Sequence, residues 1–288
     1  SVLYGVGDMA LEMSLLSEHT GIEARGVDLS QPLDAGSKER LNRAFVEHSV
    51  LVIRDQTLSA AELRDGVQNF GGIFPQHNTR FALPDCPEIH YLSNKDRYPD
   101  GTRYIPGAGY HTDHSNSETP PKATLLLAIE LPDSGGDTQY VNMAAAYEAL
   151  PDATKDRIAD LKAMHVYQSK HSARKLMGLT DAAKQKVPDA VYHPIVRTHP
   201  ESGRKSIYIN PIRIDAIEGM AEADALDLLN DLLSHATEAR FQYRHKWQPG
   251  DLVMWDNRCL LHKANGDYDH ETQTRYLYRV MLQGDRPV

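Results

Sequence analysis

Cysteine is scarce in this sequence, and its scarcity excludes several architectures. The 288 residues include only two cysteines, Cys86 and Cys259. Two distant thiols offer neither a disulfide framework nor the closely spaced pairs of a structural zinc site. Free cysteines are typical of a reducing compartment, so we expect a cytoplasmic protein without disulfides.

Long apolar runs, a signal peptide and an excess of positive charge are also missing. No hydrophobic stretch approaches the roughly 20 residues that cross a bilayer, and residues 1–13 lack the basic and apolar regions of a signal peptide. The 31 lysines and arginines are outnumbered by 40 acidic residues, which gives a formal net charge of −9. These features predict that neither a membrane nor a nucleic acid is a partner.

The domain organisation is expected to be simple. The chain begins without methionine, and its first residues resemble a leader or an expression remnant. We therefore expect residues 1–20 to be poorly ordered. Residues 21–288 are long enough for one large core and contain no stretch with the composition of a linker, so we expect a single domain.

Short strand-like segments alternate with turns and a few helices. Residues 49–54 form a nearly continuous β-branched, apolar run, which is typical of a buried strand. Apolar residues recur at helical spacing in 34–48 and 222–235, and Ser59 followed by Glu62 is the pattern of a capping box. Many short strands with inserted helices predict a mostly β protein with a jelly-roll, cupin-like core.

A hairpin is expected near the middle of the chain. Residues 123–131 form an apolar strand, and the following Pro-Asp-Ser-Gly-Gly segment is a turn signal. Residues 137–141 would then run back beside this strand.

His111 and Asp113 are the first candidates for a metal site. If they lie on an extended strand, residues two apart project from the same face, so an imidazole and a carboxylate would point together. This pair is two-thirds of the two-histidine, one-carboxylate set that binds ferrous iron and leaves coordination positions open. Such a pair is also common by chance, so a metal site needs a third ligand.

His262 is a candidate for that ligand. It follows the apolar Cys-Leu-Leu segment, whose surroundings would keep its imidazole neutral, as metal binding requires. Its spacing alone is equally compatible with a buried histidine that is hydrogen-bonded to the backbone.

Arg275 and Arg279 are four residues apart in a predicted strand. On a strand they share a face and lie about 13 Å apart. A guanidinium that faces inward is costly unless it meets an anion, and it can bind a carboxylate through two hydrogen bonds. The alternative is a pair of solvated arginines on an edge strand.

Four motifs occur in an order that one protein family shares. They are His111-x-Asp113, the Gly-Gly-Asp-Thr stretch ending at Thr138, the Trp-Asp-Asn-Arg stretch followed by His262, and Arg275-x-x-x-Arg279. From about residue 21 to residue 287, the chain resembles the Fe(II)/2-oxoglutarate-dependent dioxygenases typified by taurine dioxygenase and the phenoxyacetate-herbicide dioxygenases. The resemblance implies one dioxygenase domain with a double-stranded β-helix core.

The resemblance also implies a role for each matching residue. His111, Asp113 and His262 would be the iron ligands. Thr138 and Arg275 match the positions that hold the far carboxylate of 2-oxoglutarate. The implied cofactors are Fe(II) and the co-substrates 2-oxoglutarate and O2. Zinc could compete for such a donor set, but the open coordination positions favour iron.

Candidates for substrate binding are Arg279, His77 and Tyr110. Arg279 matches the family position that faces the acidic group of the substrate. Gly107 stands where the taurine enzymes carry an asparagine, and the neighbours of His77 match poorly, so a taurine-type sulfonate pocket is not expected. His114 is unusual after the metal carboxylate, and we expect it on the opposite face of the strand in a structural role.

We therefore expect hydroxylation of a small organic acid, a carboxylate such as an aryloxyalkanoate, with release of succinate and CO2. The product would fall apart if the hydroxylated carbon adjoins oxygen, sulfur or nitrogen. Alternatives are a sulfonate or alkyl-sulfate dioxygenase, a biosynthetic oxygenase acting on an amino-acid-derived acid, and a non-enzymatic cupin-like binding protein. The family resemblance also predicts a homo-oligomer.

Overall fold

The computed structural model describes residues 11–288. Residues 1–10, for which poor order was expected, lie outside the described residues. The same expectation is wrong for residues 11–20, because β1 (Glu12–Leu15) pairs in antiparallel fashion with β2 (Ile22–Arg25). Leu11 is only 5% exposed, and it belongs to the main hydrophobic core together with residues of β2.

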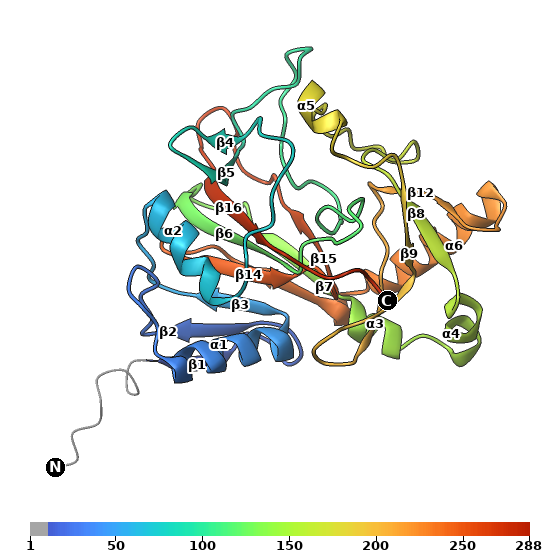
Figure 1. The fold of residues 1–288 in the computed structure, drawn as a ribbon, viewed down its shortest axis with the longest axis horizontal. Coiled ribbons are helices and arrows are strands. Elements are labelled where there is room, and N and C mark those ends of the chain that lie inside the picture. Colours follow the sequence, from blue (N-terminus) through green and yellow to red (C-terminus); the bar gives the residue numbers. More distant parts are fainter. Residues whose placement is uncertain (1–10) are drawn as a thin grey trace.

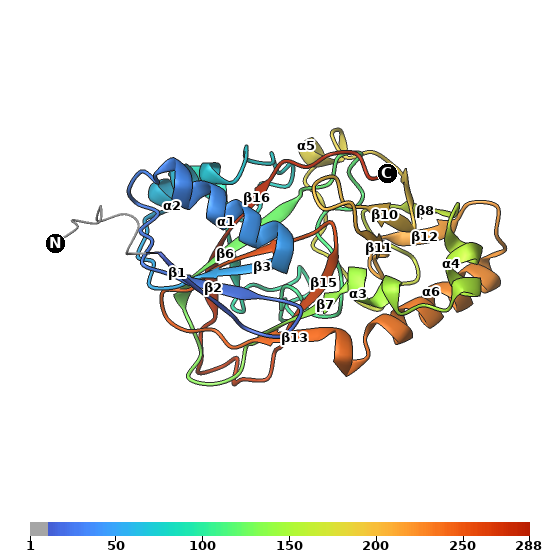
Figure 2. The same ribbon diagram turned by 90° about the horizontal axis from the view of Figure 1, so that it is seen from below.

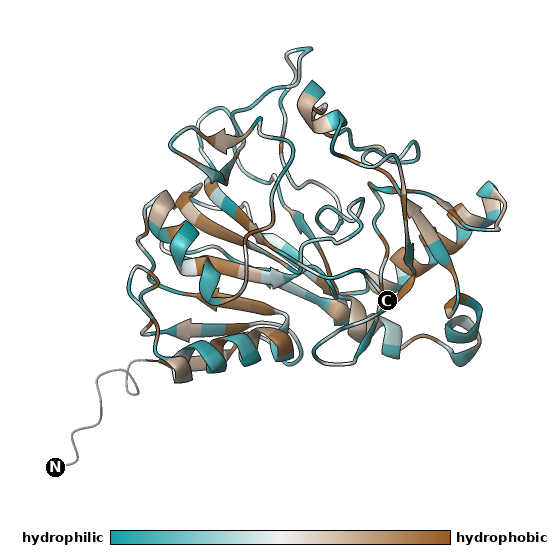
Figure 3. Ribbon diagram, in the orientation of Figure 1, coloured by the Kyte–Doolittle hydropathy of each residue, from teal (hydrophilic) through white to brown (hydrophobic). Residues whose placement is uncertain are grey.

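An eight-stranded sheet is the centre of the molecule (Figure 1). Its strand order is β1-β2-β3-β14-β6-β16-β5-β4, in which the later members are β3 (Val50–Ile53), β14 (Leu252–Asp256), β6 (Ala123–Glu130), β16 (Tyr276–Leu282), β5 (Cys86–Ser93) and β4 (Ala82–Leu83). Figure 3 shows that the central strands are predominantly hydrophobic. The alternation of side chains divides them between two cores: Leu51 and Ile53 belong to one cluster, and Val50 and Val52 to another.

Two helices cover the first face of this sheet. The helix α1 (Ala35–His48) begins after Asp34, whose side chain accepts a hydrogen bond from the backbone N–H of Ser37. The helix α2 (Ala60–Gly66) begins at the predicted capping box, and the 3-10 helix η1 (Val67–Asn69) follows it. The predicted helices at 34–48 and after Ser59 are thus confirmed, and their apolar residues pack into the core shared with the sheet.

A smaller sheet packs against the second face. It consists of β13 (Gln242–His245), β7 (Thr138–Asn142) and β15 (Leu260–Ala264). Tyr140 and Leu260 of this sheet share a hydrophobic cluster with Val52 and Val253 of the large sheet. The two face-to-face sheets form the predicted jelly-roll core.

The predicted hairpin between residues 123–131 and 137–141 is wrong. Strand β6 pairs with β14 and β16 in the large sheet, whereas β7 pairs with β13 and β15 in the small one. Gly135 and Gly136 both have positive φ, and a Cβ on Gly135 would lie 2.5 Å from the carbonyl oxygen of Asp267. This tight glycine turn carries the chain from one sheet to the other instead of back along the same sheet.

Residues 143–241 form a separate layer beside the jelly roll (Figure 2). Its elements are α3 (Met143–Glu148), α4 (Asp152–Ile158), β8 (Lys162–His165), α5 (Asp181–Lys184), β9 (Val191–Pro194), β10 (Val196–Thr198), β11 (Lys205–Ile207), β12 (Ile214–Ile217), α6 (Glu222–Ala236) and the 3-10 helix η2 (Ala239–Phe241). Helix α6 confirms the helix predicted at 222–235, and it packs with α3 and β12 in a third core. Among residues 11–288, no helix has the length and apolar character needed to cross a membrane.

Candidate active site

Two histidines from distant parts of the chain meet at the edge of the small sheet. His262 lies in β15, and His111 forms an isolated β-bridge with it: the N–H of each residue donates to the carbonyl of the other, at 3.0 and 2.8 Å. Asp113 lies in the turn that follows this bridge, so the predicted strand does not extend to it. The carboxylate nevertheless converges with the imidazoles, because its Oδ1 is 3.5 Å from Nε2 of His111 and 3.4 Å from Nε2 of His262.

Neighbouring groups orient these three side chains. Nδ1 of His111 lies 2.8 Å from the carbonyl oxygen of Gly109, so the ring proton is favoured on Nδ1. Nε2, which faces Asp113, then has a lone pair available for a metal. The hydroxyl of Thr124 donates to Oδ2 of Asp113 at 2.6 Å, which leaves Oδ1 for a ligand. The ring of His262 packs against Trp255, with 4.5 Å between the ring centroids.

The environment favours neutral imidazole and ionised carboxylate. Burial, with the nearby His262, lowers the pKa of His111 to about 3. Burial opposes ionisation of Asp113, but His262 and His111 outweigh it and hold the pKa of this carboxyl well below its ordinary value. Two imidazole nitrogens and one carboxylate oxygen within 4.8 Å of one another therefore fit a divalent ion of the ferrous type.

Arg275 supplies a buried positive charge beside this cluster. It is 5% exposed, its Nε donates to the carbonyl of Gly136 at 3.0 Å, and one Nη donates to the hydroxyl of Thr138 at 3.3 Å. The same hydroxyl accepts a bond from the indole of Trp247 at 3.0 Å, so its own proton is left to donate to a ligand. Among the described residues Arg275 has no carboxylate partner, and burial lowers the pKa of its guanidinium.

A cavity of about 70 Å³ joins these groups. Its lining includes all five residues predicted to bind iron and 2-oxoglutarate: His111, Asp113, His262, Thr138 and Arg275. Arg279 lies on its wall too. The strand β16 that carries Arg279 lies between β6 and β5, so the alternative of two solvated arginines on an edge strand is wrong.

Arg279 also lines a second cavity of about 100 Å³, which reaches His111 and Asp113 from another side. One Nη of Arg279 donates to the side-chain oxygen of Gln76 at 2.9 Å, and its Nε is buried without a hydrogen-bond partner among the described residues. The guanidinium can therefore still bind an acidic group in this second cavity.

The other predicted substrate residues are placed differently. His77 is exposed and lines an outer cavity of about 610 Å³ instead of the inner ones. Tyr110 is half-buried under Lys263, whose ammonium lies 4.7 Å from the ring centroid, and it packs against the core around α3. His114 was expected to face away from Asp113, but its positive φ turns it onto the wall of the same cavity, so that prediction is wrong.

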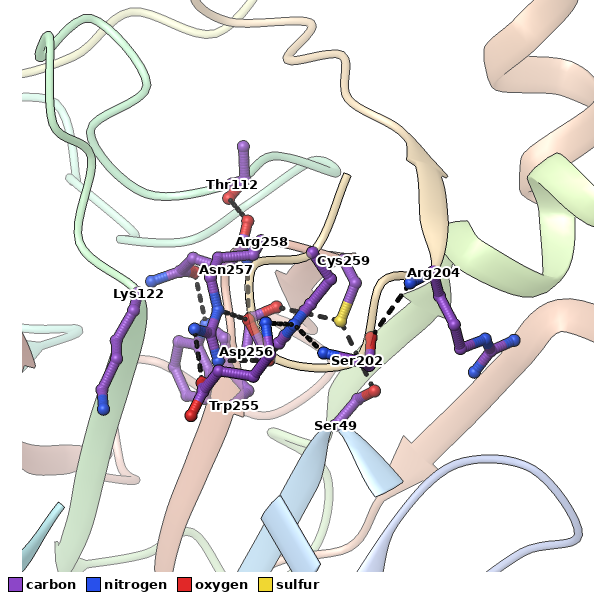
Figure 4. Close-up of polar contacts among 12 residues, drawn as sticks. Ser49, Thr112, Lys122, Ser202, Arg204, Trp255, Asp256, Asn257, Arg258 and Cys259 are labelled. Carbon is purple, nitrogen blue, oxygen red and sulfur yellow. Dashed lines mark hydrogen bonds and ion pairs between the residues drawn. The ribbon is translucent and has the colours of Figure 1, made fainter. Parts of the chain in front are cut away.

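The end of β14 and the turn that follows it (residues 257–259) hold the site in place; Figure 4 labels Trp255 and Asn257 of this segment. The indole of Trp255 donates to the side-chain oxygen of Asn257 at 3.0 Å, and the amide of Asn257 donates to the hydroxyl of Thr124 at 2.8 Å. Thr124 in turn donates to Asp113. The hydroxyl of Thr112 donates to the carbonyl of Asn257 at 3.0 Å. The turn thus fixes both the carboxylate and the backbone next to it.

Several residues of the site carry no recognisable signal in the sequence. Thr124 lies in an ordinary apolar strand, and Trp247 lies in the loop that follows β13. Arg174 and Arg213 line the second cavity from segments without periodic pattern. Only their meeting in three dimensions marks them as parts of the site.

The chain was compared with known proteins. The family model described as taurine catabolism dioxygenase TauD, TfdA family, matches residues 14–281. The chain is 35% identical to the alpha-ketoglutarate-dependent 2,4-dichlorophenoxyacetate dioxygenase of Cupriavidus pinatubonensis, over 83% of this chain and 86% of that protein. It is 34% identical to the alpha-ketoglutarate-dependent sulfate ester dioxygenase of Pseudomonas putida, over 97% and 92% of the two chains.

A solved structure agrees with these matches. The crystal structure of a taurine dioxygenase from Burkholderia xenovorans superimposes with a TM-score of 0.81 at 30% identity, and the match covers 97% of this chain and 91% of that one. The segment matched by the family model includes the His111–Asp113–His262 cluster. It also includes Arg279 in β16 and Arg275 directly before this strand. The chain therefore belongs to the TauD/TfdA family of dioxygenases.

Proposed function

We propose that this protein oxidises a small organic acid with O2 and 2-oxoglutarate, and that His111, Asp113 and His262 hold the Fe(II). One observation carries the assignment: two imidazoles and a carboxylate converge on a cavity that also contains the guanidinium of Arg275, which has no carboxylate partner among residues 11–288. A metal cluster and a buried cation in one cavity fit a co-substrate that has a chelating end and a distant carboxylate.

When bound, the iron would couple the decarboxylation of 2-oxoglutarate to succinate and CO2 with hydroxylation of a C–H bond of the substrate. The protein's own contribution is positioning. Three protein ligands leave room on the metal for the co-substrate, while Arg275 and the free hydroxyl proton of Thr138 would hold the far carboxylate. Arg279 would orient the substrate from the adjoining cavity.

The substrate that we favour is a carboxylate such as an aryloxyalkanoate. The support is the Nε of Arg279, which lines the second cavity and has no hydrogen-bond partner among the described residues, and the similarity to a 2,4-dichlorophenoxyacetate dioxygenase. A sulfate ester or sulfonate is the second candidate, because the similarity to a sulfate ester dioxygenase covers nearly the whole chain. Release of a phenol from phenoxyacetate, against release of sulfate from an alkyl sulfate, distinguishes the two.

The experiment is anaerobic titration of the Fe(II)-loaded protein with 2-oxoglutarate, which gives a visible charge-transfer band when the keto acid chelates the metal. We expect the band in the wild type, its perturbation by the true substrate, and its loss in His111→Ala. No band, and no consumption of 2-oxoglutarate with a broad panel of acids, would favour the non-enzymatic binding protein instead.

The cellular location and the oligomeric state are two further predictions, and each has a single line of support. A cytoplasmic location is supported by the two cysteines, both of which are free and buried. A homo-oligomer follows from the family resemblance alone. Both stay predictions, and fractionation and light scattering would test them.

A further inference from the structure

The second cavity contains more positive charge than one carboxylate requires. Besides Arg279, it is lined by Arg213 and Arg174. Arg213 is 6% exposed, and its guanidinium carbon lies 4.8 Å from the ring centroid of Tyr167, whose backbone carbonyl accepts one of its N–H groups. Its Nε is buried, and no residue from 11 to 288 gives it a hydrogen-bond partner. Arg213 is therefore held rigidly with part of its donor set unused.

Arg174 stands where the two inner cavities meet, because it lines both of them. Its Nε and one Nη are buried and find no hydrogen-bond partner in the part of the chain that the structure describes. The segment around it is anchored by bonds to its backbone: the hydroxyls of Tyr98 and Tyr167 donate to the carbonyls of Lys175 and Met177. The position of Arg174 is thus fixed by its neighbours and not by an ion pair of its own.

Other buried arginines of this protein show what these residues lack. Arg54 binds Asp251 at 2.8 Å, and Arg258 binds Asp256 at 2.8 Å. Within residues 11–288, neither Arg174 nor Arg213 lies within 4 Å of a carboxylate oxygen, and burial lowers the pKa of Arg213 to about 10. A buried cation without a partner is costly, and because Arg213 and Arg174 line the cavity, an anion that enters it can offset this cost.

The acids of the cavity do not supply that anion. Asp113 is committed to the metal cluster. Asp96 also lines the cavity, but it accepts a bond from the hydroxyl of Tyr91, and burial raises its pKa. A ligand with two negative charges would place one charge on Arg279 and the other on Arg213 and Arg174 together.

We propose that the primary substrate is an organic dianion, with Arg279 binding one negative charge and Arg213, assisted by Arg174, binding the second. This inference rests on the proposed function and narrows its substrate class. The second charge could belong to a separate acid group, as in a dicarboxylate, or to a doubly charged headgroup such as a phosphonate. Both chemistries present oxygens to a guanidinium in the same way.

The test uses matched probes and the anaerobic Fe(II)–2-oxoglutarate complex. One pair is phenoxyacetate and 4-carboxyphenoxyacetate, which differ by one carboxylate. The other is butylsulfonate and butylphosphonate, compared above the second pKa of the phosphonate. We expect the dianionic member of at least one pair to perturb the charge-transfer band at a concentration at least about tenfold lower than its monoanionic partner. The pair that discriminates identifies the source of the second charge.

Variants then assign the effect to residues. Arg213→Met should abolish the preference while 2-oxoglutarate binds as in the wild type, and Arg213→Lys should keep part of it. Arg174→Gln, on the half-buried segment, should weaken the preference, and it serves if Arg213→Met fails to fold. The control is Arg204→Gln, an exposed arginine that pairs with Glu148, and it should change nothing.

The outcomes separate the two proposals. If the band forms but both members of each pair act equally, or if no dianion perturbs it, the dianion inference is wrong and the proposed function stands. An unchanged preference in Arg213→Met and Arg174→Gln also overturns it. If the wild type forms no band at all, the proposed function fails, and the dianion inference fails with it.

Discussion

Among residues 11–288, two groups of three possible metal ligands combine histidine with aspartate, but the carboxylates of the two groups have different partners. His111, Asp113 and His262 form the first, and His199, Asp256 and Cys259 the second. Asp256 and Cys259 of the second are labelled in Figure 4. A count of possible ligand atoms does not distinguish them, but the partners of the carboxylates do.

In the second cluster, the carboxylate is already neutralised by a neighbouring arginine. Arg258 donates to both oxygens of Asp256, at 2.8 and 2.9 Å, and Nε2 of His199 lies 2.8 Å from the same carboxylate. Burial raises the pKa of Cys259 to about 12, so its sulfur stays a thiol and not the thiolate that binds metals. Asp113, in contrast, accepts one hydrogen bond, from the hydroxyl of Thr124, and pairs with no arginine among residues 11–288. An unneutralised buried carboxylate, more than the residue types, marks the functional site.

The largest expected effect comes from matched amide substitutions in the two clusters. Asp113→Asn should reduce 2-oxoglutarate-dependent succinate formation to background, because it removes the only charged ligand of the open cluster. Asp256→Asn should keep activity per folded molecule within a few-fold of the wild type. Succinate release normalised to folded protein measures both, and loss of turnover in the two variants alike would remove the distinction.

The same comparison applies to two buried arginines. Arg275→Gln should weaken 2-oxoglutarate binding by roughly 30-fold to several-thousand-fold, since loss of one partner of a buried charge pair costs about 2–5 kcal/mol. Its effect on the free energy of unfolding without co-substrate should be small, because the guanidinium has no carboxylate partner among the described residues. The Kd from the charge-transfer titration decides, and wild-type affinity would contradict the role of Arg275.

Arg258→Met should behave in the opposite way. It leaves Asp256 buried with only His199 and the backbone N–H of residue 258 as partners among the described residues, so the free energy of unfolding should fall by about 3–5 kcal/mol. The affinity of the folded protein for 2-oxoglutarate should stay within a few-fold of the wild type. Urea denaturation measures the first quantity; a stable variant with lost co-substrate affinity would reverse the assignment.

Acid should destabilise the metal-free protein through histidines of the cavities. Burial lowers the pKa of His90 to about 3, and it lowers the pKa of His111 to the same value. Between about pH 6.5 and 3 the unfolded chain binds protons that the folded chain excludes, so stability falls as pH falls, by up to about 1.4 kcal/mol per pH unit for each histidine. His90→Gln should reduce the slope measured by urea denaturation; an unchanged slope would show that His90 does not contribute.

The smallest effect is expected from Thr124→Val, which removes the hydrogen bond to Asp113. Loss of a partner that orients a metal ligand typically lowers metal affinity about 10- to 100-fold. Competition with a chelator measures the Fe(II) affinity. The variant should fold normally, and an affinity equal to that of the wild type would show that the carboxylate is held by other contacts.

The sequence predicted which side chains would lie together better than it predicted the path of the chain. His111, Asp113, His262 and Arg275 stand in compact motifs, so their order along the chain was informative before any geometry was known. The connection from β6 to β7 was not predictable, because a glycine-rich turn looks the same whether the chain returns along one sheet or crosses to the other. Pairing of strands is decided by contacts distant in sequence.

Local backbone conformation and isolated arginines limited the rest. A positive φ at His114 reverses the face that simple strand alternation predicts. Arg213 and Arg174 have no partner at a fixed spacing in the sequence. They are notable because no carboxylate of the described residues lies near them, which only the three-dimensional structure shows. The short strand β1 was missed because only one of its four residues is even partly buried.

The most direct test of the central distinction is anomalous diffraction at the iron edge from crystals grown anaerobically with Fe(II) and 2-oxoglutarate. We predict one strong peak bonded to Nε2 of His111, Nε2 of His262 and a carboxylate oxygen of Asp113, with the far carboxylate of the co-substrate on Arg275. A peak at the His199–Asp256–Cys259 cluster, or an Arg275 without an anion beside bound iron, would contradict this account.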